Sequence, residues 1–404
     1  MNTLLPACAL SGKRLHLGVC GSVAAYKAVD VMRALQLAGV HVGVCLTEAA
    51  QRFISPLTFA SLDAAPVYTR FFDDTENGVF AHLDPGSCAH ALLVAPAAAS
   101  TLARLACGDA DTLLAAQALA FAGPLLIAPA MNPRMWAHPA TRRNVEILRM
   151  RGASFIGPAA GRAACGDDGE GKLAPIEDIV FAAAAALLPQ DLAGVNIVLT
   201  LGPTREQWDA VRFWSNPSTG RMGAALACAA ALRGATVNAI AGPGVPALPA
   251  PVRRIDVVSA RDMFAAARDV WPQAHVGIFA AAVADFSPLP FGGGKFKKAD
   301  ATELRINFAP NPDILAELGK CARPDQKILG FAAETQNLEI NARNKLRAKN
   351  MRLIAANLLG ASDSGFASDR NTLFVADCLG REEHWPAMSK ADAAWRLLDW
   401  LSAL

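Results

Sequence analysis

The sequence carries almost no net charge, and this absence limits the kind of partner that the protein can bind. Its 38 lysines and arginines are balanced by 36 aspartates and glutamates, which leaves a formal net charge of +2 at pH 7. A nucleic-acid-binding chain normally presents a strongly basic surface to the phosphates. The composition therefore argues against a nucleic-acid partner, although basic residues gather locally at 295–298 and 343–352.

Disulfide, zinc and export signals are missing as well. The nine cysteines are scattered without a CxxC pair or Cys/His ligand spacing, which is typical of reduced thiols in a cytosolic protein. The N-terminus has no basic start followed by a long apolar run, so we expect no signal peptide. The uncharged stretch 112–131 has about the length of a membrane span, but Gly123, Pro124 and Pro129 favour a buried helix, a turn and a buried strand. We expect a cytoplasmic protein without a membrane partner.

Short apolar runs alternate with amphipathic stretches along the chain. In the first half we expect a helix at 22–38 and strands at 15–20, 41–46, 91–96 and 124–130. After a helix at 181–188 the pattern restarts, with strands expected at 195–201, 235–242, 276–284, 328–333, 352–357 and 371–377. Strands that are apolar throughout indicate parallel sheets covered on both faces. A chain of 404 residues can bury two cores, so we predict two α/β domains that meet near Gln190.

Three features of the first half are weak candidates when each is taken alone. The turn at Gly21 and Ser22 opens a helix and could hold a phosphate, but it lacks the GK[ST] ending of a Walker loop and is no GxGxxG turn, so an ordinary serine cap is the alternative. Asn132 precedes Pro133 and could present its amide to a ligand, although an Asx turn is the commoner use of Asn-Pro. His82, a lone histidine, is more often structural.

An ordered set of segments carries a resemblance to a known family. GSVAAYK (21–27), LTEAA (46–50), AHLD (81–84), PAMNPRMW (129–136) and ACGDDGEGK (164–172) resemble flavin-dependent phosphopantothenoylcysteine decarboxylases. GPTRE (202–206), VRFWSNPSTGRMG (211–223), AAVADF (281–286), GKFKK (294–298), NPDI (311–314) and GFAAET (330–335) resemble phosphopantothenate–cysteine ligases. The set is similar to bifunctional bacterial coenzyme A biosynthesis proteins. It implies a flavodoxin-like, doubly wound decarboxylase domain at 1–190 and a Rossmann-like ligase domain at 191–404.

The resemblance assigns roles around the decarboxylation. The carboxylate of a cysteinyl substrate has no electron sink until its thiol is oxidised, and FMN can take that hydride and return it. Cys165 is implied as the acid that protonates the ene-thiol, and His82 as base or orienter at the substrate's carboxylate or thiol. Asn132 is implied to hold the substrate carboxylate, and Met135 to contact the substrate. The implied FMN contacts are Gly21, Ser22, Thr47, Pro96, Ala97 and Ser100. Ala98 stands where the family often has Ser or Thr, so we expect a hydroxyl contact to be missing there. For Cys165, whose glycine-rich segment we expect to be a flexible loop that holds neither helix nor strand, an incidental exposed thiol is the alternative.

In the second half, the resemblance implies that CTP activates 4′-phosphopantothenate as an acyl-cytidylate, which the amine of L-cysteine then attacks. A triphosphate needs matching cations or a metal ion. Asn216 and Lys295 are the implied catalytic residues, Arg212 is a substrate contact, and Asp285, expected at the end of strand 276–284, is the candidate Mg²⁺ contact. The implied CTP contacts are Ala280, Ala281, Asp285, Lys295, Asn311, Pro312, Asp313, Ile314, Phe331, Lys345 and Lys349.

Local details of the second half leave room for other interpretations. Lys345, Lys349 and Arg352 are spaced to share one helix face, for which a solvated surface is the usual explanation. NPDI is expected to start a helix. Pro217 and Thr219 replace a polar residue and Ser of the family, so we expect the conformation of this loop to differ.

Assembly and competing functions complete the expectations. The family implies a homo-oligomer with trimeric decarboxylase contacts and dimeric ligase contacts, which a dodecamer would combine. A nicotinamide oxidoreductase would need a GxGxxG turn followed by an acid at a later strand end, which neither half supplies. A non-catalytic flavoprotein would share the first fold, but it would not need Cys165, His82 or a nucleotide-binding second half.

The role assigned to Cys165 can be tested by replacement with serine. Cys165→Ser preserves the size of the side chain but raises the pKa of the acid far beyond the working pH. Oxidation and CO2 release should survive, while the return of the hydride should stall, so the flavin should stay reduced after one turnover. Stopped-flow absorbance of the flavin measures this. A normal yield of 4′-phosphopantetheine at the normal rate would show that the thiol is incidental.

Overall fold

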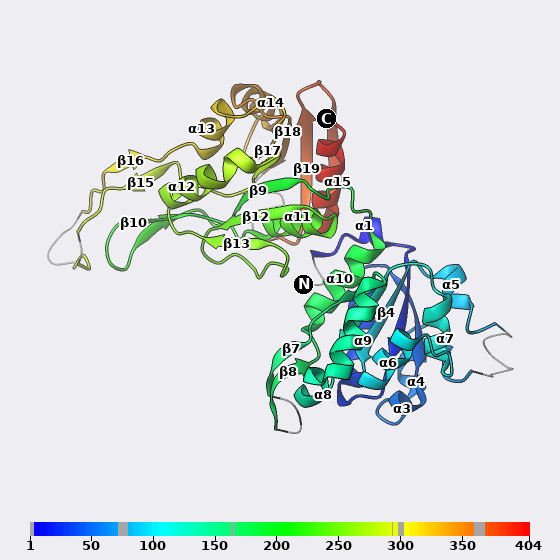
Figure 1. Ribbon diagram of the computed structural model, residues 1–404. Coiled ribbons are helices and arrows are strands. Elements are labelled where there is room, and N and C mark those ends of the chain that lie inside the picture. Colours follow the sequence, from blue (N-terminus) through cyan, green and yellow to red (C-terminus); the bar gives the residue numbers. More distant parts are fainter. Residues whose placement is uncertain are drawn as a thin grey trace. The chain divides into compact units, whose positions relative to one another are not determined.

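The computed structural model describes residues 4–71, 80–162, 164, 166–292, 294–297, 303–358 and 368–404. The chain divides into two compact units, one formed by residues 7–189 and the other by residues 190–404 together with 4–6 (Figure 1). Each unit is built around its own sheet, and the two are described separately.

The first unit contains a six-stranded parallel sheet. Its strands are β1 (Arg14–Val19), β2 (His41–Leu46), β3 (Val67–Tyr68), β4 (Ala91–Ala97), β5 (Leu125–Pro129) and β6 (Ser154–Phe155). Their order is β3-β2-β1-β4-β5-β6. Without the two-residue edge strand β3, this is the flavodoxin-like order, with the chain reversing its direction of travel between β1 and β4. The predicted doubly wound sheet is confirmed.

Helices cover both faces of this sheet. They are α1 (Ala7–Leu10), η2 (Val23–Tyr26), α2 (Lys27–Leu37), α3 (Glu48–Gln51), α4 (Pro56–Ala60), α5 (Asp84–Cys88), α6 (Ala99–Cys107), α7 (Leu113–Ala120), α8 (Pro133–Ala137), α9 (Pro139–Met150) and α10 (Ile176–Leu187). The uncharged stretch 112–131 forms α7 and β5, as expected. Among the described residues, no helix combines the length and the apolar character needed to cross a membrane.

A hairpin replaces the loop expected around ACGDDGEGK. β7 (Ala159–Arg162) pairs antiparallel with β8 (Asp168–Lys172), so the expectation that this segment holds no strand was wrong. Gly169 and Gly171, at φ of 147° and 155°, adopt backbone conformations that other residues rarely reach. Gly171 also lies against the backbone of Met131, whose carbonyl oxygen would be 2.4 Å from an added Cβ. Glycine is therefore required for this hairpin to pack where it does.

The second unit has an eight-stranded sheet of mixed direction. Its strands are β9 (Asn196–Leu201), β12 (Thr236–Ala241), β13 (Arg253–Asp256), β14 (Val276–Phe279), β17 (Lys327–Glu334), β18 (Leu353–Leu358), β19 (Arg370–Asp377) and β20 (Glu382–Ser389). The order β13-β12-β9-β14-β17-β18 is parallel and Rossmann-like, whereas β19 and β20 are added antiparallel. The strand expected at 276–284 ends at Phe279, so Asp285 lies in the following loop and not at a strand end.

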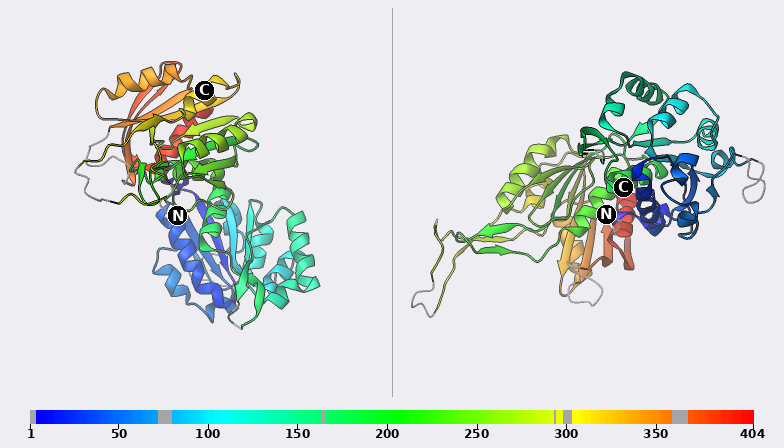
Figure 2. Two further views of the ribbon diagram at one scale, coloured as in Figure 1. Left: turned by 90° about the vertical axis from the view of Figure 1, so that its left-hand side faces the viewer. Right: turned by 90° about the horizontal axis from the view of Figure 1, so that it is seen from below.

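The helices of this unit lie on the two faces of its sheet, and two short hairpins extend from one end (Figures 1 and 2). The helices are α11 (Arg221–Leu232), α12 (Ala260–Val270), η3 (Trp271–Gln273), α13 (Ile314–Lys320), α14 (Leu338–Ala348) and α15 (Lys390–Ser402). The hairpins are β10 (Arg205–Gln207) with β11 (Phe213–Ser215), and β15 (Phe286–Pro288) with β16 (Phe308–Pro310). NPDI does start a helix, α13. In contrast, α14 ends before Lys349 and Arg352, so the prediction that these two residues share a helix face with Lys345 was wrong.

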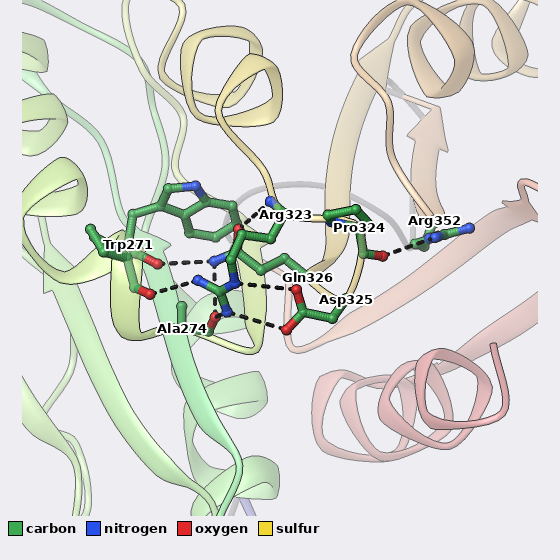
Figure 3. Close-up of polar contacts among 8 residues, drawn as sticks. Trp271, Ala274, Arg323, Pro324, Asp325, Gln326 and Arg352 are labelled. Atoms are coloured by element: carbon green, nitrogen blue, oxygen red, sulfur yellow. Dashed lines mark hydrogen bonds and ion pairs between the residues drawn. The ribbon is translucent and has the colours of Figure 1, made fainter.

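A buried polar cluster fixes the turn between α13 and β17 (Figure 3). The Gln326 side-chain amide donates to the carbonyls of Trp271 and Ala274 at 3.0 and 2.9 Å, and its oxygen accepts from the Arg323 amide at 2.8 Å. The Arg323 guanidinium adds a bond to the Ala274 carbonyl at 3.0 Å. These contacts join the end of η3 to the turn that leads into the central strand β17.

Removal of the Gln326 amide should destabilise the second unit. Gln326 is only 5% exposed, so Gln326→Ala removes three buried hydrogen bonds, leaves the Arg323 amide without this acceptor, and should cost about 2 kcal/mol of unfolding free energy. Urea unfolding followed by tryptophan fluorescence measures the loss. Gln336→Ala, at an exposed position, is the matched control and should change little. Equal stability of the two variants would contradict the role given to this cluster.

Candidate functional site

The carboxyl ends of the first sheet bring most of the predicted flavin residues to one edge. Gly21 and Ser22 follow β1, Thr47 follows β2, and Pro96 and Ala97 end β4. At Gly21 the backbone approaches α3 so closely that a Cβ atom would lie 2.5 Å from the Cβ of Ala49. The close approach explains why glycine is needed at this turn.

Two of these residues cap helices, whereas α6, the helix that follows β4, has no side-chain cap. Ser22 accepts the amide of Ala24 at 3.3 Å, and Thr47 accepts the amide of Ala50 at 3.2 Å. At the start of α6, Ala98 provides no side-chain acceptor, so this helix begins without a side-chain cap and Ser100 lies in its first turn. Uncapped amides at a helix start favour an anion. At α6 this edge therefore offers backbone amides to a phosphate, beside the hydroxyl of Ser100.

Asn132 and the residues after it meet the β7–β8 hairpin. The Asn132 side-chain oxygen accepts the amide of Arg134 at 2.8 Å, which is the Asx turn that the sequence left open as an alternative. Its side-chain amide donates to the Asp167 carboxylate at 2.7 Å, and the Arg134 guanidinium donates to the other Asp167 oxygen at 3.0 Å. Met135 is 49% exposed beside them. Asn132 thus already binds a carboxylate that belongs to the chain.

Of the two predicted residues His82 and Cys165, the structure describes only His82. His82 stacks on Phe71, with ring centroids 5.8 Å apart, and lies edge-on to Phe80 at 6.5 Å. Cys165 lies outside the residues that the structure describes. The roles of both residues therefore stay predictions.

A buried histidine near His82 was missed in the sequence. His16 lies within β1 with its Nε2 2.9 Å from the Gln117 side-chain oxygen, and the Gln117 amide donates to the Ala81 carbonyl at 2.8 Å. Burial lowers the pKa of His16 to about 4, although the Gln117 hydrogen bond raises it, so the ring is neutral at pH 7. This chain of contacts holds the residue that precedes His82. No sequence signal separates His16 from its apolar neighbours in the strand.

The second unit has a cavity of about 560 Å³ over the carboxyl ends of β9, β14, β17 and β18. Such a position, beside the strand where the chain order reverses, is where open α/β sheets bind ligands. The predicted residues that line it are Asn216, Ala280, Ala281, Asp285, Asn311, Pro312, Asp313, Ile314, Phe331, Lys345 and Lys349. Residues from far apart in the sequence are thus brought together, as the candidate nucleotide site requires.

Two asparagines fix the loop between β14 and β15. The Asn216 side-chain amide donates to the carbonyls of Ala282 and Val283 at 3.2 and 3.1 Å. The Asn311 side-chain amide donates to the Ala284 carbonyl at 2.8 Å. The loop that carries Asp285 is therefore held from both sides of the cavity, and Asp285 itself is exposed.

The two lysines of the cavity have carbonyl and carboxylate partners. Lys345 donates to the Phe331 carbonyl at 2.9 Å, and Lys349 pairs with Asp313 at 2.6 Å. Burial and the neighbouring Lys349 lower the pKa of Lys345. Burial acts to raise the pKa of Asp313, but the hydrogen bonds from Lys349 and the Ala316 amide, together with the charges of Lys349 and Lys345, outweigh it and the pKa is lowered. Both lysines are held in place at the cavity wall.

Arg212 and Lys295 do not line this cavity. Both belong to the hairpin end of the unit, where Asp209 accepts the amides of Val211, Arg212 and Phe296 at 2.8, 2.6 and 3.0 Å. Burial raises the pKa of Asp209, but these amide bonds outweigh it and lower the pKa to about 2. Lys295 is exposed beside this cluster. The structure therefore does not bring these two residues together with the other ligase candidates.

The polar residues of the cavity wall that were missed in the sequence include Arg221, Asn357, Asn371 and Lys390. Lys390 is only 6% exposed and donates to the Ser368 carbonyl, and burial together with Arg221 lowers its pKa. Arg221 opens α11 and pairs with Asp369 at 2.9 Å. Arg221 belongs to the quoted SNPSTGRMG segment, so its position was available, but Lys390 shows no pattern before the sheet is assembled.

In the part of the chain that the structure describes, side chains that could bind a metal ion do not form a cluster. Within the described ranges, no group of three or more His, Cys, Asp or Glu side chains could hold a metal ion. A metal ion held near Asp285 would therefore take most of its ligands from the phosphates and water.

Comparisons with known proteins cover both units. The family model described as Flavoprotein matches residues 7–188, and the model described as DNA/pantothenate metabolism flavoprotein C-terminal domain matches residues 192–404. The coenzyme A biosynthesis bifunctional protein CoaBC of Bacillus subtilis is 42% identical over 98% of both chains. That of Escherichia coli is 41% identical over 91% of both. The chain belongs to the CoaBC family.

A solved CoaBC C-terminal domain is also similar, at 34% identity and a TM-score of 0.45, over 53% of this chain and 97% of that domain. Membership of the CoaBC family decides between the competing classes, because a nicotinamide oxidoreductase or a regulatory flavoprotein would not match both families in this order. The resemblance read from the ordered motifs is confirmed.

The lowered pKa of Lys345 predicts how anion binding in this CoaBC cavity depends on pH. Inorganic triphosphate should bind more weakly as the pH rises through the lowered pKa, below the range in which an ordinary lysine loses its proton, because Lys345 then becomes neutral. Lys345→Gln should weaken binding at pH 7 about tenfold and flatten this pH dependence. Calorimetric titration between pH 7 and pH 10 measures both.

Lys320→Gln is the matched control, since Lys320 pairs with Glu317 on the surface and does not line the cavity. It should leave affinity and pH profile unchanged. An unchanged pH profile in Lys345→Gln would show that another group titrates.

Proposed function

We propose that this chain carries out two successive steps of coenzyme A biosynthesis. Residues 191–404 join 4′-phosphopantothenate to L-cysteine at the expense of CTP, and residues 1–190 then decarboxylate the product to 4′-phosphopantetheine with FMN. The observation that carries the proposal is the cavity of the second unit, which gathers the implied nucleotide residues other than Lys295 from four separate segments at the sheet's reversal point. Similarity to CoaBC proteins over nearly the full chain supports the pairing of the two activities.

The ligase chemistry needs cations and fixed donors around the phosphates. Lys345 and Lys349 stand at one wall of the cavity, and Arg221 and Lys390 are further cations of its lining. Charge that develops on the departing pyrophosphate is stabilised by such groups, which are already oriented before the reaction. Asn216, fixed by two carbonyls, orients the acyl group for attack by the amine of cysteine.

Lys295 acts on the same phosphates in this proposal, but from the hairpin end of the unit. Because Lys295 does not line the cavity of its own chain, it reaches a nucleotide there only after movement of its loop or from a second copy of the chain. Large apolar side chains are exposed on these hairpins, including Trp214 at 55%, Phe286 at 53% and Phe213 at 46%. Such a surface supports pairing between ligase units. Trimeric contacts between flavoprotein units remain part of the proposed homo-oligomer, in the cytoplasm.

The residues at the first sheet's edge fit a flavin phosphate. The uncapped start of α6 provides backbone amides for it, and Gly21 lets the turn after β1 pack closely against α3. FMN, when bound, accepts the hydride of the substrate and later returns it. The chain's own part is to orient the substrate through Asn132 and His82 and to deliver a proton from Cys165.

A reconstituted reaction tests the proposal. The purified protein should be yellow, and with 4′-phosphopantothenate and L-cysteine it should release pyrophosphate faster from CTP than from other nucleotides, followed by CO2. Coupled pyrophosphate detection and trapping of CO2 from carboxyl-labelled cysteine follow the two steps separately. Omission of cysteine should abolish CO2. A colourless protein that takes up no FMN would refute the decarboxylase half, and the absence of pyrophosphate with every nucleotide would refute the ligase half.

A further inference from the structure

The β7–β8 hairpin is held tightly against the residues that follow β5. The Met131 amide donates to the Gly171 carbonyl at 2.9 Å, and the Trp136 indole donates to Glu170 at 3.3 Å. The Arg142 guanidinium reaches the same Glu170 oxygen at 3.4 Å. These contacts fix the position of β8 relative to α8. The Asp167 side chain, just before β8, is thereby placed beside Asn132 and Arg134.

The two oxygens of the Asp167 carboxylate have separate donors. Oδ2 accepts from the Asn132 amide at 2.7 Å, and Oδ1 accepts from the Arg134 guanidinium at 3.0 Å. An amide and a guanidinium that face the two oxygens of one carboxylate form a two-point carboxylate site, with charge-assisted hydrogen bonds. Nothing in this arrangement is particular to aspartate, because any carboxylate of similar reach satisfies the same donors.

The family resemblance already implies that Asn132 holds the carboxylate that the substrate loses; we propose that Arg134 is the second donor to this carboxylate, and that Asp167 occupies the subsite formed by these two donors when substrate is absent. The inference rests on the proposed decarboxylase function. Two carboxylates cannot share one pair of donors without strong repulsion, so the substrate must displace Asp167 as it binds. Arg134 thereby becomes a second substrate contact, and Asp167 an internal competitor.

The exposure of the pair makes this exchange easy. The Arg134 side chain is 83% exposed and that of Asp167 is 29% exposed, so solvent screens much of their attraction. An internal occupant lowers the apparent affinity for the substrate, because only those protein molecules whose subsite is open can bind it. Loss of CO2 removes the competing carboxylate, so Asp167 returns to its donors. The subsite therefore distinguishes the substrate from its product.

Two probes without a thiol separate carboxylate binding from turnover. The serine analogue of the substrate, 4′-phosphopantothenoylserine, keeps the carboxylate, and the corresponding ethanolamine amide lacks it. Calorimetric titration of the FMN-loaded full-length protein should show that Asp167→Asn binds the serine probe about three- to tenfold more tightly, because the internal competitor has lost its charge. The affinity for the ethanolamine probe should not change. In turnover assays the KM for phosphopantothenoylcysteine should fall by a similar factor.

Arg134 is tested in the background that lacks the competitor. Adding Arg134→Gln to Asp167→Asn should weaken binding of the serine probe several-fold and leave binding of the ethanolamine probe unchanged. If Arg134 only holds Asp167, the double variant would bind the serine probe as tightly as Asp167→Asn does, and the substrate contact would be refuted. Asp111→Asn is the matched control, because it breaks a comparable surface pair with Arg104 at 2.7 Å and should alter neither probe.

The remaining outcomes separate this inference from the proposed function. If the wild-type protein releases no CO2 from phosphopantothenoylcysteine, the proposed function has failed. If it releases CO2 but Asp167→Asn changes the affinity for both probes equally, or for neither, Asp167 is a structural residue and only the internal competition is refuted.

Discussion

Both units depend on one constraint, which is that parallel strands buried on both faces must end at a common edge. Each strand places its carboxyl end beside those of its neighbours, so the loops that leave these ends lie together at one solvent-facing edge of the sheet. In the first unit this edge collects Gly21, Thr47, Ala97 and Asn132. In the second it creates the cavity that is lined by Asn216, Phe331 and their neighbours. The chemistry of both units is therefore located by the packing of the sheets.

The two units provide for anions by different means. The first offers backbone amides at the start of α6, and Gly21 lets the turn after β1 pack closely against α3. These donors are fixed, neutral and independent of pH. The second offers lysine side chains, among them Lys345 and Lys390, whose pKa values burial lowers. A single phosphate needs few charges, whereas a triphosphate must have most of its charge matched, so the difference agrees with the proposed FMN and CTP.

In both units the donors already have partners from the chain. Lys349 pairs with Asp313, Lys345 with the Phe331 carbonyl, and Asn132 and Arg134 with Asp167. A polar group left without a partner in a partly buried site costs free energy, so internal partners keep each site in its active geometry. A ligand then binds by exchange of partners, and its net affinity is the difference between two sets of contacts. Such exchange favours ligands that bring more charge than the internal partner.

The sequence alone determined the two-domain α/β architecture, nearly all the central strands and the identity of the family. Apolar runs mark buried strands because both of their faces are covered, and NPDI marks the start of α13 because Asp313 caps it. Sequence also named most residues of the ligase cavity, but only through the ordered motifs. Local pattern failed where tertiary contacts outweigh it. The apolar run after Phe279 looks like strand, yet Asn216 and Asn311 hold it as a loop.

Only the tertiary structure decided what depends on distant partners. Gly169 and Gly171 form a strand because β7 pairs with β8 and the hairpin packs on Met131, which no local propensity encodes. Lys390 enters the cavity because the antiparallel strands β19 and β20 return the chain to the sheet before α15. Asn132 and Asp167 are 35 residues apart, and their contact exists only because the hairpin folds back onto α8. Residue type follows from local chemistry, but which donors and acceptors meet is set by the packing of segments that are remote in sequence.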